Sequence, residues 1–413
     1  MTQPANAPAL SYVQRKYTAA GSPDRAGIAL CLSGGGYRAA LFHLGGLRRL
    51  HELGVLGQLS FVSSVSGGSI TAAFLARAIA RAPNGTIADF DAEFARPLRE
   101  FTQRNIRTPA ILRRFLPWNW FRSDTGVRAI AESVRRALPD FHLRDLPAKP
   151  RFIFCAADMV FGDAWVFERD RMGDDQAGYC PPRAEDDVAQ AVAASACFPP
   201  VFNPLRMRLD PSKLASGQFT EPTPSRGLRA KLVRGIRLTD GGDYDNLGLE
   251  PVWKKAATVL VSDGGEPFVF QAKYGLLSRI ERYSDILYAQ VVSLRKRWLL
   301  SSFLTGELNG AYWGIGSDVA HFAPLAPGYP ADLAKNLIAH IRTDEDAFSD
   351  TESMVLQDHG YALADVSLRI HAPHLITTPR AFREPFPEMN WDHPGDVQTA
   401  LRRSAERGLL GHS

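Results

Sequence analysis

Two glycine-rich turns near the start of the chain each connect a short apolar run to a helical pattern. The first turn, Ser-Gly-Gly-Gly at 33–36, follows the apolar residues 28–32, and the second, Ser-Val-Ser-Gly-Gly at 64–68, follows residues 59–62. A strand that leads through a tight turn into a helix is the repeating unit of parallel sheets covered by helices. The sequence therefore predicts an α/β fold.

The rest of the chain continues this alternation. Strands are expected at 27–32, 59–64, 151–157, 164–168, 235–239 and 257–262. Helices are expected at 37–53, 67–82, 187–196, 277–303 and 352–369. The strands are short apolar runs without clean polar alternation, as expected where both faces of a mostly parallel sheet are buried. The polar stretches 172–186 and 209–227 are expected to be surface loops.

Composition limits the class of protein. The 413 residues are enough for one large α/β domain, and a net charge of +4 does not favour nucleic acid, although a local basic patch could favour anionic lipid. The four cysteines have no metal-like spacing, so a reducing compartment is expected. Residues 1–24 contain no apolar signal-peptide core, and no run of about 18 apolar residues occurs. We therefore expect a cytoplasmic protein without signal peptide or transmembrane helix.

Ser66 stands at the apex of the second turn. A nucleophile elbow holds a serine between a strand and a helix, and it needs small neighbours because the backbone folds back close to that side chain. Gly67 and Gly68 provide them after the serine, whereas Ser64 stands where the elbow pattern usually has glycine. The helix dipole would favour negative charge that develops at Ser66. The alternative interpretation is a serine helix cap followed by a glycine packing contact.

The triple glycine of the first turn can expose backbone N–H groups. Gly34, Gly35 and Gly36 could donate to an oxyanion, and each such donor is worth roughly 2.7–4 kcal/mol of transition-state stabilisation. The same geometry can cradle a phosphate, but no Gly-Lys-Ser/Thr follows, and Ala39 stands where a dinucleotide motif needs glycine. A purely structural turn is the third interpretation. Arg38 is expected to brace the loop, with a contact to a substrate phosphate as the alternative.

The general base must come from elsewhere in the chain. His43 and His51 fall within a helical pattern, which favours a packed or solvated role. Asp240 follows the strand at 235–239 and precedes two glycines, at the strand end where active sites of open α/β sheets collect. Asp263 also precedes two glycines and is the competing candidate. Asp240 is favoured because the loop after it is rich in residues that order themselves by side-chain hydrogen bonds.

These motifs resemble those of the patatin-like phospholipases, a family of lipid acyl hydrolases. The resemblance covers roughly residues 27–265 and rests on four motifs in the family's order. They are residues 34–38, 64–68, 194–204, and 240–242 with Asn246 downstream. The resemblance implies a three-layer α/β/α sandwich and ester substrates with long acyl chains. It also implies that no metal or cofactor is needed.

Residue by residue, the resemblance implies Ser66 as the nucleophile and Asp240 as its only base partner. Gly34, Gly35 and Gly36 would form the oxyanion hole. The expected function is that of a phospholipase or esterase that forms an acyl-enzyme. The alternative is a catalytically weak lipid-binding or scaffold protein that retains the fold.

We expect residues 27–370 to form the catalytic domain with helical additions, between an N-terminal extension at 1–26 and a C-terminal extension at 371–413. Two stretches, 111–122 and 295–300, combine basic and aromatic residues and could lie at a membrane surface. For 111–122, packing against the protein with the arginines facing outward is the favoured alternative. For 295–300, the favoured alternative is one polar face of the helix expected at 277–303. The expected partners are a lipid ester substrate and, transiently, a membrane surface, with no nucleic acid.

Overall fold

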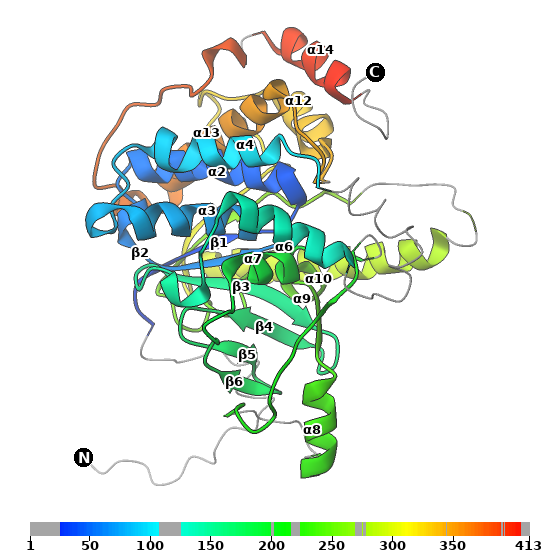
Figure 1. The fold of residues 1–413 in the computed structure, drawn as a ribbon. Helices are drawn as coiled ribbons and strands as arrows, with labels where there is room; N and C mark the ends of the chain where they lie inside the picture. The colour runs from blue at the N-terminus through cyan, green and yellow to red at the C-terminus, as the bar shows by residue number, and fades with distance from the viewer. Residues whose placement is uncertain are drawn as a thin grey trace.

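Parallel strands form the centre of one sheet (Figure 1). The structure is a computed structural model that describes residues 25–106, 125–199, 202–215, 224–268, 275, 278–343, 345–389, 391 and 393–405. The central strands, in spatial order, are β10 (Asn309–Gly314), β9 (Thr258–Asp263), β1 (Ile28–Leu32), β2 (Leu59–Val65) and β3 (Arg151–Asp158). All are parallel to their neighbours. The predicted α/β fold with a mostly parallel central sheet is confirmed.

Antiparallel strands extend the sheet beyond β3. They are β4 (Asp163–Phe167), β5 (Met172–Asp174) and β6 (Gly178–Cys180). On the other edge of β3, β8 (Arg237–Asp240) pairs with the last residues of that strand, and β7 (Leu205–Arg206) pairs with β8. This short antiparallel strand matters for the site, because it carries Asp240.

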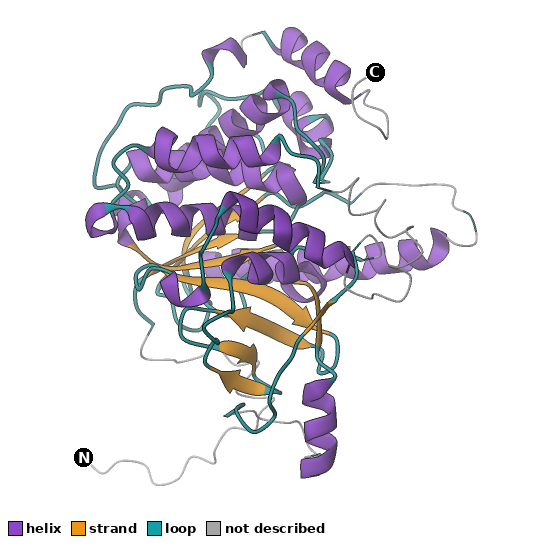
Figure 2. Cartoon of the chain, viewed as in Figure 1, coloured by secondary structure: helices purple, strands orange, loops and turns teal. Residues whose placement is uncertain are grey.

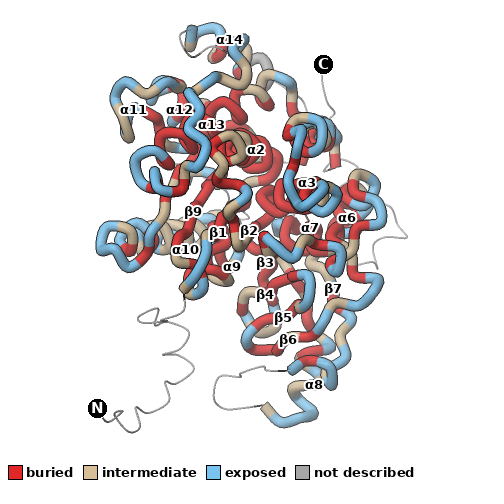
Figure 3. Tube along the Cα trace, turned by 90° about the vertical axis from the view of Figure 1, so that its left-hand side faces the viewer, coloured by how far each residue is buried: buried red, intermediate tan, exposed pale blue. Residues whose placement is uncertain are grey.

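Helices cover both faces of the sheet and give three layers (Figure 2). In β1, Leu30 and Leu32 belong to the core under α2 (Gly36–Glu52), α3 (Gly67–Arg81) and α13 (Asp350–His371). The alternate residues Ala29 and Cys31 belong to a second core on the opposite face, which includes Leu299 of α10 (Ser278–Leu304). Because each face is buried, the central strands show no polar alternation in sequence and lie inside the molecule (Figure 3).

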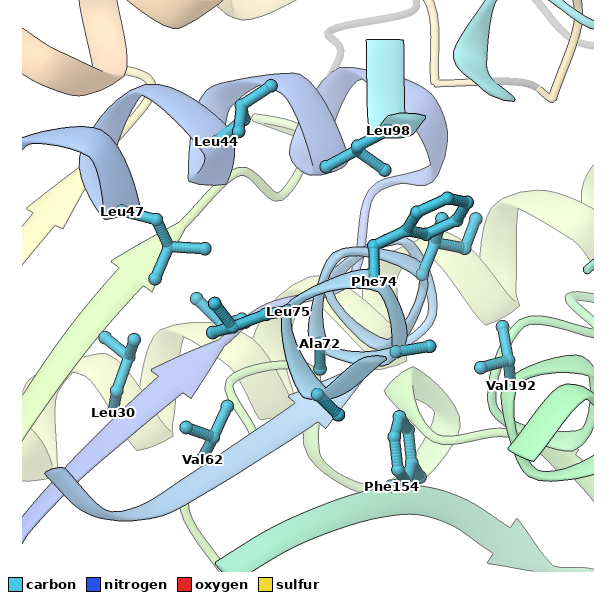
Figure 4. Close-up of a cluster of buried hydrophobic side chains, with 14 of the residues drawn as sticks. Leu30, Leu44, Leu47, Val62, Ala72, Phe74, Leu75, Leu98, Phe154 and Val192 are labelled. Atoms are coloured by element: carbon cyan, nitrogen blue, oxygen red, sulfur yellow. The ribbon is translucent and has the colours of Figure 1, made fainter. Parts of the chain in front are cut away.

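The larger core lies between the sheet and α2, α3 and α13. Figure 4 shows Leu30 and Val62 of neighbouring strands beneath Leu47 of α2 and Leu75 of α3. The remaining described α-helices are α4 (Arg96–Thr102), α6 (Thr125–Ala137), α7 (Val188–Ser195), α8 (Arg226–Arg234), α9 (Gly242–Asp245), α11 (Val319–Phe322), α12 (Ala331–Asn336) and α14 (Pro394–Ala405). Of the helices that the structure describes, none is both long and apolar enough to span a bilayer.

Two sequence expectations need correction. Residues 172–186 are not only loop, because they contain β5 and β6, in which Met172, Asp174 and Cys180 are buried. Strands of three residues with glycine and aspartate carry too little pattern to be recognised. Within 209–227, residues 216–223 lie outside the described part, and α8 already begins at Arg226. The stretch 111–122 also lies outside the described residues.

Candidate active site

The register of the sheet brings the ends of β2 and β8 together. Val65, the last residue of β2, lies opposite Cys155 of β3. β8 runs toward it along the same edge of β3, and its last residue, Asp240, lies opposite Ala156. The two strands therefore end at neighbouring positions of β3, and Ser66 follows β2 at that point. This places Ser66 and Asp240 in one cavity, as the sequence predicts.

The turn at Ser66 has the geometry of a nucleophile elbow. Its φ of 50° and ψ of −118° lie in a region that side-chain-bearing residues rarely adopt, and such strain costs on the order of 1–3 kcal/mol. The helix α3 begins at the next residue. A Cβ atom at Gly67 would lie 2.0 Å from the carbonyl oxygen of Gly36, so the elbow packs tightly against the first glycine turn. Only glycine fits at position 67.

Buried serines support this elbow from below. The N–H of Ser66 donates to Ser195 Oγ at 2.9 Å, and Ser195 Oγ donates to the carbonyl oxygen of Cys155 at 2.6 Å. Ser69 Oγ lies 2.8 Å from Ser195 Oγ and 3.0 Å from Ser64 Oγ. Ser64, which replaces the usual glycine of the motif, is therefore accommodated as a member of this hydrogen-bond network.

Ser195 also connects the elbow to the segment that carries Asp240. It is the last residue of α7, and its carbonyl oxygen accepts the N–H of Gly241 at 3.2 Å. One residue thus holds the backbone on both sides of the site. Sequence reasoning included Ser195 only within a family-like segment and did not assign it a role.

Asp240 is a buried carboxyl beside Ser66. It is 2% exposed, and its Oδ1 accepts the N–H of Gly242 at 2.7 Å. Its Oδ2 has no partner in normal hydrogen-bond geometry among the described residues, although the nearby Ser66 hydroxyl lowers the pKa of the carboxyl slightly. Burial outweighs these effects and raises the pKa of Asp240 to about 7. Such a group can exchange a proton near neutral pH.

Asp263, the competing candidate, is held differently. Its Oδ2 lies 2.5 Å from Lys296 Nζ and accepts the Tyr312 hydroxyl at 2.7 Å. Burial alone would raise its pKa, but the Lys296 ammonium and these hydrogen bonds lower the pKa to about 2. It does not line the cavity that contains Ser66. Asp263 is therefore a permanently ionised partner of Lys296, whereas Asp240 is poised to titrate.

The first glycine turn forms one wall of the cavity. Gly35 and Gly36 line it beside Ser66, and their N–H groups have no hydrogen-bond partner among the described residues. The N–H of Gly34 instead donates to the carbonyl oxygen of Asn246 at 3.1 Å. Gly36 has a φ of 56°, and a Cβ there would lie 1.4 Å from the carbonyl oxygen of Thr343. Two of the three predicted donors are thus available to a ligand.

The sequence analysis did not identify one further candidate hydrogen-bond donor, the backbone N–H of Gly67. The N–H of Gly67, directly after Ser66, has no partner among the described residues, as expected at the start of a helix. In many hydrolases the N–H after the nucleophile contributes to the oxyanion hole. The position after the serine in the motif is the signal that could have identified it.

Arg38 has the contacts of a loop brace. The side chain is fully buried and donates to the carbonyl oxygens of Gly264, Ala339 and Ile341. Burial lowers its pKa to about 10, so it stays protonated. These bonds fix the start of α2 against the segments after β9 and β10. The structure does not bring the guanidinium to the cavity that contains Ser66.

His43 has the packed role that the sequence indicates. Its Nε2 lies 2.9 Å from the carbonyl oxygen of Ser33, and its Nδ1 lies 2.7 Å from Ser262 Oγ. Burial lowers the pKa of this imidazole to about 4, so it remains neutral. His51 stacks on Phe90, away from the site.

The stretch 295–300 is mostly occupied by contacts within the protein. Arg295 pairs with Glu250 at 3.1 Å, Lys296 pairs with Asp263, and Leu299 is buried. The favoured alternative of the sequence analysis, one face of a long helix, therefore fits this stretch better than a lipid-binding patch.

The cavity around Ser66 has a volume of about 260 Å³. Its lining includes Phe198, Phe202 and Tyr288, so aromatic surface faces the candidate nucleophile. Tyr288 comes from α10, and nothing in the pattern of that helix indicated a place at the site. Among the described residues, no group of three or more His, Cys, Asp or Glu side chains is arranged to hold a metal ion.

The family model described as Patatin-like phospholipase matches residues 30–253, more than half of the chain. Similar solved structures include human GIVD cytosolic phospholipase A2, with 14% identity, a TM-score of 0.47, and coverage of 92% of this chain and 60% of that one. VipD from Legionella pneumophila has 13% identity, a TM-score of 0.35, and coverage of 92% and 75%. This chain thus covers less than two thirds of the first structure's length. A comparison with curated proteins finds no match.

Proposed function

The chain belongs to the patatin-like phospholipase family, and we propose that it is a lipid acyl hydrolase that cleaves carboxylic esters of phospholipids or glycerolipids. The proposed catalytic groups are Ser66 and Asp240. One observation carries the proposal: a serine on a strained turn lies beside a buried carboxyl with a pKa of about 7, in one cavity with free backbone N–H groups. This combination supplies a nucleophile, a base and oxyanion donors.

In the first step, Ser66 Oγ attacks the ester carbonyl carbon while Asp240 accepts the hydroxyl proton. The carbonyl oxygen becomes an oxyanion and accepts hydrogen bonds from the N–H groups of Gly35 and Gly36. When the tetrahedral intermediate collapses, the bond between the carbonyl carbon and the alcohol oxygen breaks. Asp240 returns the proton to the departing alcohol or lysolipid, and the acyl group stays on Ser66.

In the second step, water attacks the acyl-enzyme. Asp240 accepts a proton from the water, the same N–H groups bind the second oxyanion, and the fatty acid leaves as Ser66 Oγ regains a proton from Asp240. The cycle consumes one ester and one water and yields one acid and one alcohol. Arg38 would act only by holding the glycine turn in place.

We further propose transient contact with a lipid surface through α10. Tyr283, Leu287 and Leu294 lie on one stripe of this helix and are 64%, 68% and 58% exposed. An apolar stripe exposed to solvent is typical of a binding surface. Replacing Leu287 and Leu294 by aspartate is expected to reduce co-sedimentation with phosphatidylcholine vesicles. Unchanged sedimentation of the folded variant would refute this role of α10.

Labelling with a fluorophosphonate probe tests the catalytic proposal. The probe phosphonylates activated serines, so the wild-type chain is expected to be labelled and the Ser66→Ala variant is not. If the folded wild-type chain were not labelled and hydrolysed no ester, the alternative of a lipid-binding or scaffold protein would be favoured. The matched control is Ser284→Ala, which changes an exposed serine. Ser195 is not suitable for a control variant, because it contacts the elbow.

A further inference from the structure

A second cavity adjoins the one that contains Ser66. It has a volume of about 300 Å³ and shares Phe198, Asn246, Glu266 and Tyr288 with the first. Its remaining lining comes from α10 and from the segment after β9. We refer to it as the α10 cavity. The two cavities share four lining residues, so a ligand held at Ser66 would reach the α10 cavity by passing these side chains.

The α10 cavity follows one face of the helix. Asp285, Ala289, Val292 and Lys296 line it, at steps of three or four residues. Together with Arg282 they span about 21 Å of helix, at about 1.5 Å per residue. One leaflet of a bilayer contains about 15 Å of hydrocarbon. The lining therefore extends along the helix over a distance comparable to that of an extended acyl chain.

Two aromatic side chains of this cavity are exposed to solvent, in a lining that also includes the charged residues Glu266, Arg282, Asp285 and Lys296. Phe198 and Phe268 are 47% and 38% exposed, which is high for large aromatic side chains. Phe198 packs edge-on against Tyr288, with ring centroids 6.3 Å apart. The aliphatic side chains of Ala289 and Val292 continue this surface along α10. An apolar ligand would cover these rings and remove them from water.

The cations of the α10 cavity already have partners. Lys296 Nζ lies 2.5 Å from Asp263 Oδ2. The Arg282 guanidinium lies 4.1 Å from the centroid of the Phe268 ring and 3.8 Å from a carboxylate oxygen of Asp285. A phosphate head group would have to compete with these carboxylates. The charges therefore favour a hydrocarbon over a head group as the occupant.

We propose that the α10 cavity binds the acyl chain of the ester whose carbonyl is held at Ser66, and that Ala289 and Val292 limit the chain length accepted. This inference rests on the proposed hydrolase activity. The helix α10 lies outside residues 30–253, so the α10 side of this acyl site belongs to the part of the chain beyond the family match, whereas Phe198 and Asn246 lie within that match.

The test fills the α10 cavity and compares esters of different length. Ala289→Trp places a ring in the cavity, and Ala92→Trp places the same ring at an exposed alanine outside α10. The ratio of kcat/KM for p-nitrophenyl palmitate to that for p-nitrophenyl butyrate is expected to fall about tenfold or more in Ala289→Trp and to stay unchanged in Ala92→Trp. Val292→Phe, a smaller change, is expected to lower the ratio less.

Each outcome decides between the proposals. If the folded Ala289→Trp and Val292→Phe variants keep the wild-type ratio, the acyl chain lies elsewhere and the inference is wrong, while the hydrolase proposal stands. If phosphatidylcholine and diacylglycerol with identical chains respond differently to these variants, the cavity holds a head group instead. If the wild-type chain hydrolyses neither p-nitrophenyl ester, the proposed function itself fails.

Discussion

Replacing Asp240 by asparagine should abolish ester hydrolysis. It should also raise the unfolding free energy relative to that of the wild-type chain, by an amount that grows as the pH rises. The reason is the raised pKa of Asp240, about 7 in the folded chain against an ordinary value of 3.8. A carboxyl whose folded pKa lies above its unfolded pKa stabilises the fold only while it is protonated. Its contribution is complete below pH 3.8 and is lost as the pH rises toward and through 7.

The size of the effect follows from these two values. Between pH 5 and pH 8 the unfolded carboxyl is already ionised, while the folded one loses its proton. At 1.36 kcal/mol per pH unit, the wild-type chain loses about 3 kcal/mol of unfolding free energy through this group over that interval. Asparagine cannot ionise, so the Asp240→Asn variant avoids this loss. Other titrating groups are common to both proteins and cancel in the difference.

Urea unfolding at pH 5 and pH 8 measures this difference. The stability of Asp240→Asn relative to wild type is expected to increase by about 3 kcal/mol from the lower to the higher pH. The matched control is Asp263→Asn. Because the pKa of Asp263 is lowered to about 2, this carboxylate stabilises the fold above pH 3.8, and its loss should cost about 2 kcal/mol at both pH values.

The same two variants should also differ in their rates of ester hydrolysis. Asp240→Asn is expected to abolish turnover, and Asp263→Asn is expected to keep most of it, because Asp263 does not line the cavity around Ser66. A stability difference for Asp240→Asn that is equal at pH 5 and pH 8 would show that this carboxyl does not have a raised pKa. Loss of turnover in Asp263→Asn alone would reverse the choice between the two aspartates.

Three further predictions concern the same site. The kcat/KM for p-nitrophenyl butyrate should rise with pH through an apparent pKa of about 7 and then level off, because the ionised form of Asp240 is the base. Ser195→Ala should cost about 1–3 kcal/mol of stability in urea unfolding and lower kcat, because the N–H of Ser66 loses its buried acceptor. Gly67→Ala should abolish fluorophosphonate labelling, because a Cβ there would lie 2.0 Å from the carbonyl oxygen of Gly36, and circular dichroism would distinguish loss of the site from loss of the fold.

Four of the five central strands and the two glycine turns could be predicted because local sequence determines them. The fifth, β10, was not predicted, because its six residues include two glycines and an asparagine, which are depleted in strands. The apolar run before Ser33 must be extended and buried, and the glycines after Ser66 permit one tight turn into a helix. Their boundaries in the structure differ from the expected ones by one or two residues. These elements carry Ser66, Gly35 and Gly36, so that side of the candidate site could be located from the sequence.

The rest of the site depends on pairing between distant segments, which local patterns do not encode. Nothing near Asp240 indicates that its strand runs antiparallel to β3, and nothing near Tyr288 indicates that α10 reaches the cavity. The choice of Asp240 over Asp263 rested on the loops that follow them. The structure supplies a stronger physical distinction, because among the described residues Asp263 has a lysine partner and Asp240 has none.

The strands β2 and β8 run toward each other along one edge of β3 and end at neighbouring residues. This arrangement explains how the proposed Ser66–Asp240 dyad could act without a histidine. A histidine has an ordinary pKa of about 6.5, which suits proton transfer at neutral pH. Here the last pairing of β8 with β3 buries the Asp240 carboxyl beside Ser66, and burial, assisted by the nearby charge of Asp243, raises its pKa to a similar value. Because β3 pairs with the ends of both β2 and β8, no third side chain is needed to orient the base. The proposed dyad therefore depends on the short antiparallel pairing of β8 with β3 at Ala156. Substitutions that weaken this pairing should lower both the pKa of Asp240 and the rate of hydrolysis.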